Sequence, residues 1–223
     1  MPIDALSDAG KSGMVIAVDG PAASGKGTIA KALAQRFGLP HMDTGLLYRA
    51  VALNLWRWGG DPGNEFEAMR ASQDLKLVDM DDPELRSEAV SKIASAISAY
   101  PGVRLALFDR QREFATGAAG AVLDGRDIGT VIAPDADVKL FVTAAPEVRA
   151  RRRLSELEGR GMPAHYDEVL ADIRARDERD SHRSAAPLVQ AKDAILIDTS
   201  SLDREAAIAE AIRLVEAALE GAQ

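Results

Sequence analysis

The stretch GPAASGKGT, residues 20–28, follows the apolar run 14–18 and decides the fold class. The phosphate-loop pattern is Gly, any four residues, Gly, Lys, then Ser or Thr. Here Gly27 stands where the hydroxyl residue is expected, and Thr28 comes one place later. An apolar strand, a glycine-rich turn and a helix that begins near Lys26 would direct successive backbone N–H groups at one anion. The alternative is an ordinary glycine-rich turn between a strand and a helix.

The position of the hydroxyl at Thr28, one residue later than usual, is compatible with a phosphate-binding site. A helix advances by about 100° per residue, so moving the hydroxyl from Gly27 to Thr28 rotates it by about a quarter turn at the helix start. Thr28 can therefore reach Mg²⁺, directly or through water. Asp124 ends a second apolar run, and phosphate-loop enzymes use a strand-end carboxylate to hold the metal or its water. An Asp at this point also serves as a turn or cap residue in many proteins.

Five short apolar runs, separated by longer segments of helical period, predict a parallel sheet with helices on both faces. The strands are expected at 14–18, 39–42, 121–123, 138–142 and 194–197. The helix after the phosphate loop should end at Gly38, and the last helix should be capped by Ser200 or Ser201. Ligands of such sheets bind beyond the carboxyl ends of the strands.

Length and composition restrict the class of protein. A chain of 223 residues with 47% hydrophobic residues fits one domain with inserted segments. The formal net charge of -8 argues against nucleic acid or an anionic membrane as the main partner. The absence of cysteine suits a reducing compartment, so we expect a cytoplasmic protein. Residues 1–13 lack a signal-peptide pattern and are expected to form a flexible tail.

Two stretches interrupt the alternation of strands and helices. Residues 61–115 are polar and helical, with a short LKLVDMDD segment, and residues 149–183 are rich in arginine. Both are predicted to be insertions over the sheet edge. The core then comprises 14–60, 116–148 and 184–223.

The arginine-rich segment holds nine arginines and no lysine. Because the planar guanidinium binds phosphate bidentately, this composition favours a phosphate clamp. Eight acidic residues share the segment, so an exposed helix with many ion pairs is the alternative. Arg176, Asp180 and Arg183 share one helical face, and Arg before Asp is the poorer order for helix stabilisation. That face is better explained by a ligand.

The chain offers no evident general base. His41, His165 and His182 stand in unrelated contexts and are expected to be surface or packing residues. A phosphate acceptor has a second pKa near 6 and is already an oxyanion at neutral pH. Catalysis would then depend on positioning and on neutralising charge as a phosphoryl group moves between two anions.

Three further motifs accompany the loop: DTGLLYR at 43–49, DGRDIGT at 124–130 and RARDERDSHRSAAPL at 174–188. Together they resemble the bacterial cytidylate kinase family over most of the chain. The resemblance implies a P-loop nucleoside monophosphate kinase fold of class α/β, with a five-stranded parallel core. It also implies a nucleotide-binding insertion at 61–115 and a short lid with the arginine-rich helix at 149–183. The implied substrates are ATP and CMP or dCMP, with Mg²⁺ as cofactor, in a protein expected to be a monomer.

The resemblance also implies roles for individual residues. The ATP phosphates would contact Gly20, Pro21, Ala22, Ala23, Ser24, Gly25, Lys26, Gly27 and Thr28. The CMP-binding residues would be Thr44, Arg49, Ser95, Arg104, Arg126, Asp127, Arg176 and Asp180. The catalytic residues would be Lys26, Arg152, Arg153 and Arg183. The cytosine edge has an amino donor beside two acceptors, so a carboxylate and an arginine such as Asp127 and Arg104 complement it.

Two other functions remain open. A kinase for UMP, AMP or a sugar acid would keep the phosphate loop but is expected to lack the set Ser95, Arg104 and Asp127. A nucleotide-dependent switch of the GTPase type would carry an Asn-Lys-x-Asp guanine reader, which the sequence does not contain.

Overall fold

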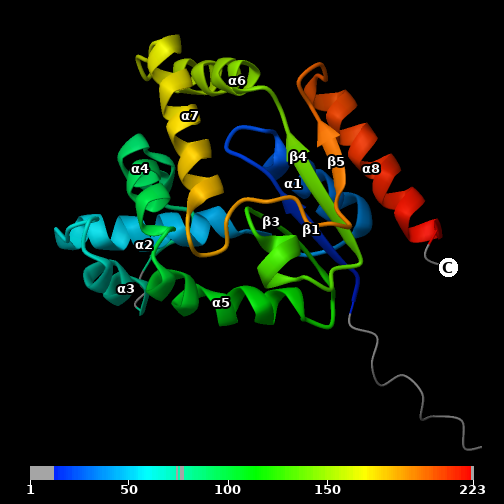
Figure 1. Ribbon diagram of the computed structural model, residues 1–223, viewed down its shortest axis with the longest axis horizontal. Coiled ribbons are helices and arrows are strands. Elements are labelled where there is room, and N and C mark those ends of the chain that lie inside the picture. Colours follow the sequence, from blue (N-terminus) through cyan, green and yellow to red (C-terminus); the bar gives the residue numbers. More distant parts are fainter. Residues whose placement is uncertain (1–12, 74, 76–77, 222–223) are drawn as a thin grey trace, which may run out of the picture.

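The computed structural model describes residues 13–73, 75 and 78–221. In this part of the chain, five parallel strands form one sheet in the order β2-β3-β1-β4-β5, as predicted (Figure 1). The strands are β1 (Val15–Asp19), β2 (His41–Asp43), β3 (Ala121–Gly125), β4 (Val138–Thr143) and β5 (Ile195–Asp198). Each strand ends one or two residues later than expected, because polar residues continue the pairing; Asp19 is in register with Gly125 and Phe141.

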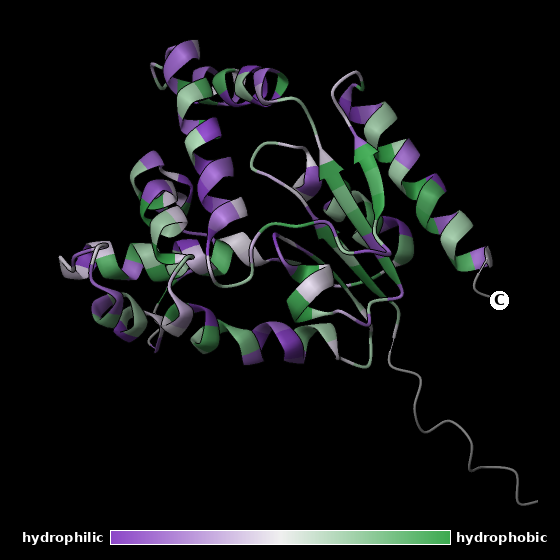
Figure 2. Cartoon of the chain, in the orientation of Figure 1, coloured by the Kyte–Doolittle hydropathy of each residue, from purple (hydrophilic) through white to green (hydrophobic). Residues whose placement is uncertain are grey.

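Helices cover both faces of the sheet, which confirms the predicted layers. On one face α1 (Lys26–Phe37) and α8 (Arg204–Gly221) share an apolar cluster with β1, β4 and β5. On the other face α5 (Pro101–Ala115) and a π-helical segment, η3 (Ile128–Ile132), pack against β1 and β3. Figure 2 shows the strands as the most hydrophobic elements between these helices.

The ends of two helices test the capping predictions. α1 ends at Gly38, which adopts a left-handed φ of 66° and donates its N–H to Ala34, as expected. The predicted cap of α8 at Ser200 or Ser201 is wrong. Asp203 precedes the helix, and its Oδ1 accepts the N–H of Ala206 at 2.8 Å. The Ser200 hydroxyl is engaged elsewhere, donating to Asp198 and accepting from the Ala145 N–H.

The segment predicted as the first insertion, 61–115, contains α3 (Glu65–Gln73), the 3-10 helix η2 (Pro83–Arg86), α4 (Glu88–Ile97) and α5. These elements share a cluster with α2 (Thr44–Trp58), separate from the clusters on the sheet. No strand lies among the described residues of 61–115. Two residues of LKLVDMDD, 76–77, lie outside the described part, as do residues 1–12 of the predicted tail.

The segment predicted as the lid contains α6 (Pro146–Gly159) and α7 (Tyr166–His182). The two helices pack through a small cluster that includes Ala150, Leu157 and Ile173. α7 lies beside α4, on the side of the sheet to which the strands point (Figure 1). Of the described helices, none has the length and apolar character that a membrane span requires.

Candidate active site

A cavity of about 550 Å³ lies beyond the carboxyl ends of β2 and β3, between the phosphate loop, α4 and α7. Its lining includes Lys26 from the loop together with Arg176, Asp180 and Arg183 from the arginine-rich segment. Lysines and arginines outnumber acidic residues in this lining, although the whole chain has a net charge of -8. The cavity therefore concentrates positive charge and favours anionic ligands.

Most of the residues predicted for the site line this cavity. They are Ala22, Ala23, Lys26, Gly27, Thr44, Arg49, Ser95, Arg104, Asp124, Arg126, Asp127, Arg153, Arg176, Asp180 and Arg183. The lining does not include Gly20, Pro21, Ser24, Gly25, Thr28 and Arg152.

The phosphate loop has an unusual backbone. Ala23 and Gly25 adopt left-handed φ values of 58° and 94°. Within the described residues, no backbone N–H of 22–27 donates to another part of the protein, whereas Thr28 N and Ile29 N donate to Gly25 O at 3.1 Å. Gly20 is required at the start of the loop, because a Cβ there would lie 2.0 Å from Val142 O. Unused N–H groups at a helix start form a site for an anion.

Lys26 adds a charge to this site. Its Nζ lies 3.4 Å from the Pro21 carbonyl oxygen, to which it donates. Burial, together with repulsion from Arg126, lowers the pKa of Lys26 to about 7. An anion bound beside Lys26 would restore its ordinary pKa, so the loop is prepared for a charged ligand.

Asp124 is the next-to-last residue of β3 and is almost fully buried. Its Oδ1 lies 2.8 Å from His41 Nε2, which fixes the orientation of the carboxylate. A Cβ built on Gly27 would lie 3.5 Å from Asp124 Oδ2, so the second oxygen faces the start of α1. Gly27 thus keeps open the space between the helix start and this carboxylate.

On the far side of the cavity, Asp127 stands between two arginines. It pairs with Arg104, and its Oδ1 lies 3.5 Å from Nη2 of Arg183. Arg104 also donates to Ser98 O at 3.2 Å, and its guanidinium lies 5.7 Å from the centre of the Tyr48 ring. These residues form a polar wall with donors and an acceptor side by side.

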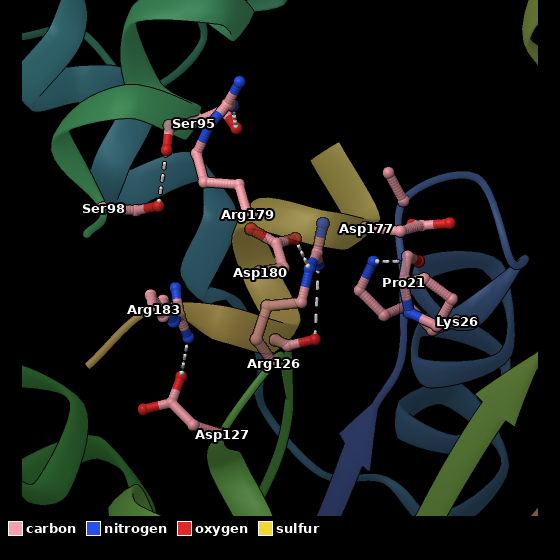
Figure 3. A network of polar contacts seen from close by, with 12 residues as sticks. Pro21, Lys26, Ser95, Ser98, Arg126, Asp127, Asp177, Arg179, Asp180 and Arg183 are labelled. Atoms are coloured by element: carbon pink, nitrogen blue, oxygen red, sulfur yellow. Dashed lines mark hydrogen bonds and ion pairs between the residues drawn. The ribbon is translucent and has the colours of Figure 1, made fainter. Parts of the chain in front are cut away.

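Arg126 and Arg176 lie between this wall and the phosphate loop. Nε of Arg126 donates to Asp180 Oδ2 at 2.8 Å, as Figure 3 shows. Nε of Arg176 is buried, and within the described part of the protein it has no hydrogen-bond partner. Burial and the neighbouring Arg126 lower the pKa of Arg176 to about 10. Since a buried cation without a partner is costly, this position calls for an anionic ligand.

The model of the cytidylate kinase family matches residues 16–217. This chain belongs to the cytidylate kinase family. It is 57% identical to the cytidylate kinase of Methylocella silvestris over 92% of this chain and 95% of that protein. Its identity to the cytidylate kinase of Xanthobacter autotrophicus is also 57%, over 92% of this chain and 98% of that one.

The fold is that of the P-loop nucleoside monophosphate kinases, as the resemblance implied. A crystal structure of an uncharacterized protein from Eubacterium ventriosum superposes with a TM-score of 0.55 at 16% identity. That alignment covers 91% of this chain and 98% of the other, and it supports the shared fold alone.

Arg152 and Arg153, two of the residues predicted to be catalytic, lie in different surroundings in this member of the cytidylate kinase family. Arg152 donates to Ser24 O at 3.3 Å and to Thr199 O at 2.6 Å, so it joins the phosphate loop to the segment after β5. Arg153 lines the cavity and pairs with Glu88 and Glu156.

Sequence reasoning assigned no role to three residues that support the cavity. Asp19 accepts the N–H groups of Ile128 and Gly129, both at 2.8 Å, and burial raises its pKa to about 6. Arg149 is buried and donates to the carbonyl oxygens of Ala22 and Ala144 and to both carboxylate oxygens of Asp177. His41, expected to be a surface or packing residue, is the partner of Asp124.

Arg179 was missed as well, although the spacing of the arginine-rich segment contains a signal for it. It follows Arg176 by three residues, and neighbours at this spacing share a helical face. Arg179 lines the cavity and donates from Nη1 to Ser95 Oγ at 2.5 Å. The pattern of the segment thus indicates the face, whereas the contact with α4 depends on the tertiary structure.

Proposed function

We propose that this protein is an ATP-dependent cytidylate kinase, which transfers the γ-phosphoryl group of ATP to CMP or dCMP. The products are ADP and CDP or dCDP. One observation carries the proposal: a single cavity joins Lys26 and loop N–H groups that donate to no other described residue with a second cation, Arg176, whose buried Nε has no hydrogen-bond partner in the described residues. Two anions therefore fit into one cavity, with a polar wall beside the second.

The phosphate loop would bind the donor. Its N–H groups would hold the β- and γ-phosphates, and Lys26 would neutralise charge on the transferring group. Burial makes this charge effective, because water does not screen it as it does on the surface. Arg153 and Arg183 are the further cations that we propose for the transferring group.

The second anion would be the phosphate of the acceptor nucleotide, held by Arg126 and Arg176. An oxygen of this phosphate attacks the γ-phosphorus of ATP while the bond to the β–γ bridging oxygen breaks. No proton must be removed, since this phosphate is largely ionised at neutral pH. The acceptor base would meet the wall of Arg104, Asp127 and Ser95, and Thr44, Arg49 and Asp180 would complete the contacts to ribose and phosphate.

We propose Mg²⁺ as the cofactor. Magnesium takes oxygen ligands, and an ion bound here would reduce the negative charge of the donor phosphates. The Asp124 carboxylate, with Oδ2 facing the start of α1, suits this chemistry, and Thr28 begins the same helix. Thr28 and Asp124 would hold the ion directly or through water.

We further propose that the enzyme acts as a monomer in the cytoplasm, with ATP and CMP or dCMP as its partners and with neither nucleic acid nor membrane. The lack of cysteine supports the proposed compartment, and the net charge of -8 supports the exclusion of nucleic acid and membrane as partners.

A substrate panel tests the proposed function. Purified protein is assayed with Mg·ATP and each of CMP, dCMP, UMP, AMP and GMP, and the ADP formed is measured. We expect kcat/KM to be greatest for CMP or dCMP. Preference for UMP, AMP or GMP, or hydrolysis of ATP that no acceptor accelerates, would overturn the assignment.

A further inference from the structure

Arg179 of α7 and Ser95 of α4 meet across the cavity, and both line it (Figure 3). The guanidinium donates from Nη1 to Ser95 Oγ at 2.5 Å. Ser95 is 5% exposed, whereas Arg179 as a residue is exposed, so the bond between them is partly buried. The carbonyl of Ser95 is a separate group, which accepts from the Ser98 hydroxyl.

The chemistry of the two groups gives this contact a direction. A guanidinium has donors and no acceptor, whereas a serine hydroxyl has one donor and two acceptor positions. The bond therefore uses a lone pair of Ser95 Oγ and leaves its hydrogen available. In the described part of the chain, no other hydrogen bond reaches this hydroxyl. A charged donor also makes the bond stronger than one between neutral groups.

Other contacts between the two segments lie nearer the surface. Lys92 of α4 approaches Asp172 of α7 at 3.6 Å, and both side chains are more than half exposed. Exposed pairs of this kind contribute little to stability and are screened by salt. The Arg179 bond is instead directed at Ser95, which lines the same cavity as Arg104 and Asp127. A bond at this position is better suited to orienting the Ser95 hydroxyl toward a ligand than to simply holding α7 against α4.

Resting on the proposed function, we infer that Arg179 is a positioning residue for base specificity, which makes the Ser95 hydroxyl a hydrogen-bond donor toward the pyrimidine. Cytosine has acceptors at N3 and O2, whereas uracil carries a hydrogen at N3. A hydroxyl whose hydrogen is free and which has one of its two acceptor positions taken by Arg179 matches N3 of cytosine better than the N3–H of uracil. A site that leaves a buried polar group unpaired rejects the wrong ligand.

The test compares kcat/KM for CMP and UMP in three variants. Arg179→Met removes the donors but keeps the length of the side chain, and Arg179→Lys keeps one cationic donor. Arg174→Met is the matched control, because Arg174 lies on the same helix, is 60% exposed and pairs with Glu147 at the surface. We expect Arg179→Met to lower the CMP/UMP ratio roughly tenfold, the scale of one lost hydrogen bond. Arg179→Lys should restore part of the ratio, and Arg174→Met should leave it unchanged.

A double variant excludes a general structural effect. If Arg179 acts through the hydroxyl, adding Arg179→Met to Ser95→Ala should not lower the ratio below that of Ser95→Ala alone. An unchanged CMP/UMP ratio in Arg179→Met, or a further decrease of this ratio in the double variant, would overturn the inference. The proposed function would still stand in that case, provided that the wild-type enzyme prefers CMP. A wild-type enzyme without that preference would refute both.

Discussion

His41 Nε2 lies 2.8 Å from Asp124 Oδ1, so a residue of the short edge strand β2 holds the strand-end carboxylate of β3. With Oδ1 engaged, Oδ2 is the oxygen that faces Gly27 and the start of α1. Loss of a partner that orients a metal ligand typically lowers metal affinity about tenfold to a hundredfold. The contact therefore connects β2 with the proposed magnesium site.

Replacing His41 should weaken magnesium binding. His41→Phe keeps a ring of similar size but removes the hydrogen bond, so we expect the Mg²⁺ concentration at half-maximal rate to rise roughly tenfold to a hundredfold. Binding of Mn²⁺ in the presence of an ATP analogue, followed by electron paramagnetic resonance, should weaken in parallel. His41→Asn, which retains a donor, serves as the control and should show a smaller effect. Wild-type Mn²⁺ affinity in His41→Phe would contradict the role.

Lys26 should affect turnover rather than folding. Lys26→Met removes the charge that opposes the developing charge of the transferring phosphoryl group, so kcat should fall by at least roughly a hundredfold. The melting temperature should not decrease, because the buried charge is costly without its ligand. Arg36→Met is the matched control, since Arg36 is exposed on the same helix and pairs with Glu216. A kcat within a few-fold of wild type would remove Lys26 from the mechanism.

The lowered pKa of Lys26 predicts proton uptake on nucleotide binding. With a pKa of about 7, Lys26 is mostly neutral in the free protein at pH 8. Bound polyphosphate favours the charged form and raises this pKa, so the protein should take up close to one proton. Titration calorimetry with a non-hydrolysable ATP analogue in two buffers of different ionisation enthalpy measures this uptake. It should disappear in Lys26→Met, and buffer-independent heats for the wild type would refute the prediction.

Asp19 should make stability depend on pH. Its pKa is raised from 3.8 to about 6, chiefly by burial, so between these values the folded protein binds a proton that the unfolded chain does not. The contribution of Asp19 to stability therefore increases as pH falls through 6, by up to about 3 kcal/mol. Urea unfolding of the wild type and of Asp19→Asn measures this effect. The unfolding free energy of the wild type, relative to that of Asp19→Asn, should increase as the pH is lowered from 7 to 4. A constant difference would exclude the shifted pKa.

Two glycines of the phosphate loop should respond differently to alanine. At Gly27 the added methyl would make ordinary contact with Asp124 at 3.5 Å, so Gly27→Ala should fold normally. It would nevertheless occupy space between the start of α1 and the Asp124 carboxylate proposed for magnesium, and we expect kcat to fall roughly tenfold to a hundredfold. Gly20→Ala would place a methyl 2.0 Å from Val142 O and should lower the melting temperature instead. Equal effects of both variants on both measurements would contradict this distinction.

The parts of the fold that depend on local pattern could be predicted from the sequence. The phosphate loop, the Gly38 stop and the apolar runs of the strands each follow from neighbouring residues, and the structure contains them. The cap of α8 was predicted wrongly, because Ser200, Ser201 and Asp203 are all suitable caps. Only the tertiary contacts of Ser200 with Asp198 and Ala145 decide among them.

The supporting residues of the candidate site were harder to predict. His41 acts on Asp124 because β2 and β3 pair in one register, with Asp43 opposite Asp124, so two side chains 83 positions apart in the sequence meet. Arg152 belongs to a cluster of arginines. Composition alone does not distinguish the arginines that face the cavity from Arg152, which joins the phosphate loop to Thr199. Composition predicts an anion site here, whereas the role of each guanidinium depends on its tertiary neighbours.

The single guanidinium of Arg149 holds the phosphate loop through Ala22, the end of β4 through Ala144 and the helix α7 through Asp177. Three segments tied to one buried group cannot pivot independently without breaking charged hydrogen bonds. We therefore expect the phosphate loop and α7 to move as one rigid body. The cavity would then widen for the exit of product by a movement of α4 and its neighbours on the opposite side.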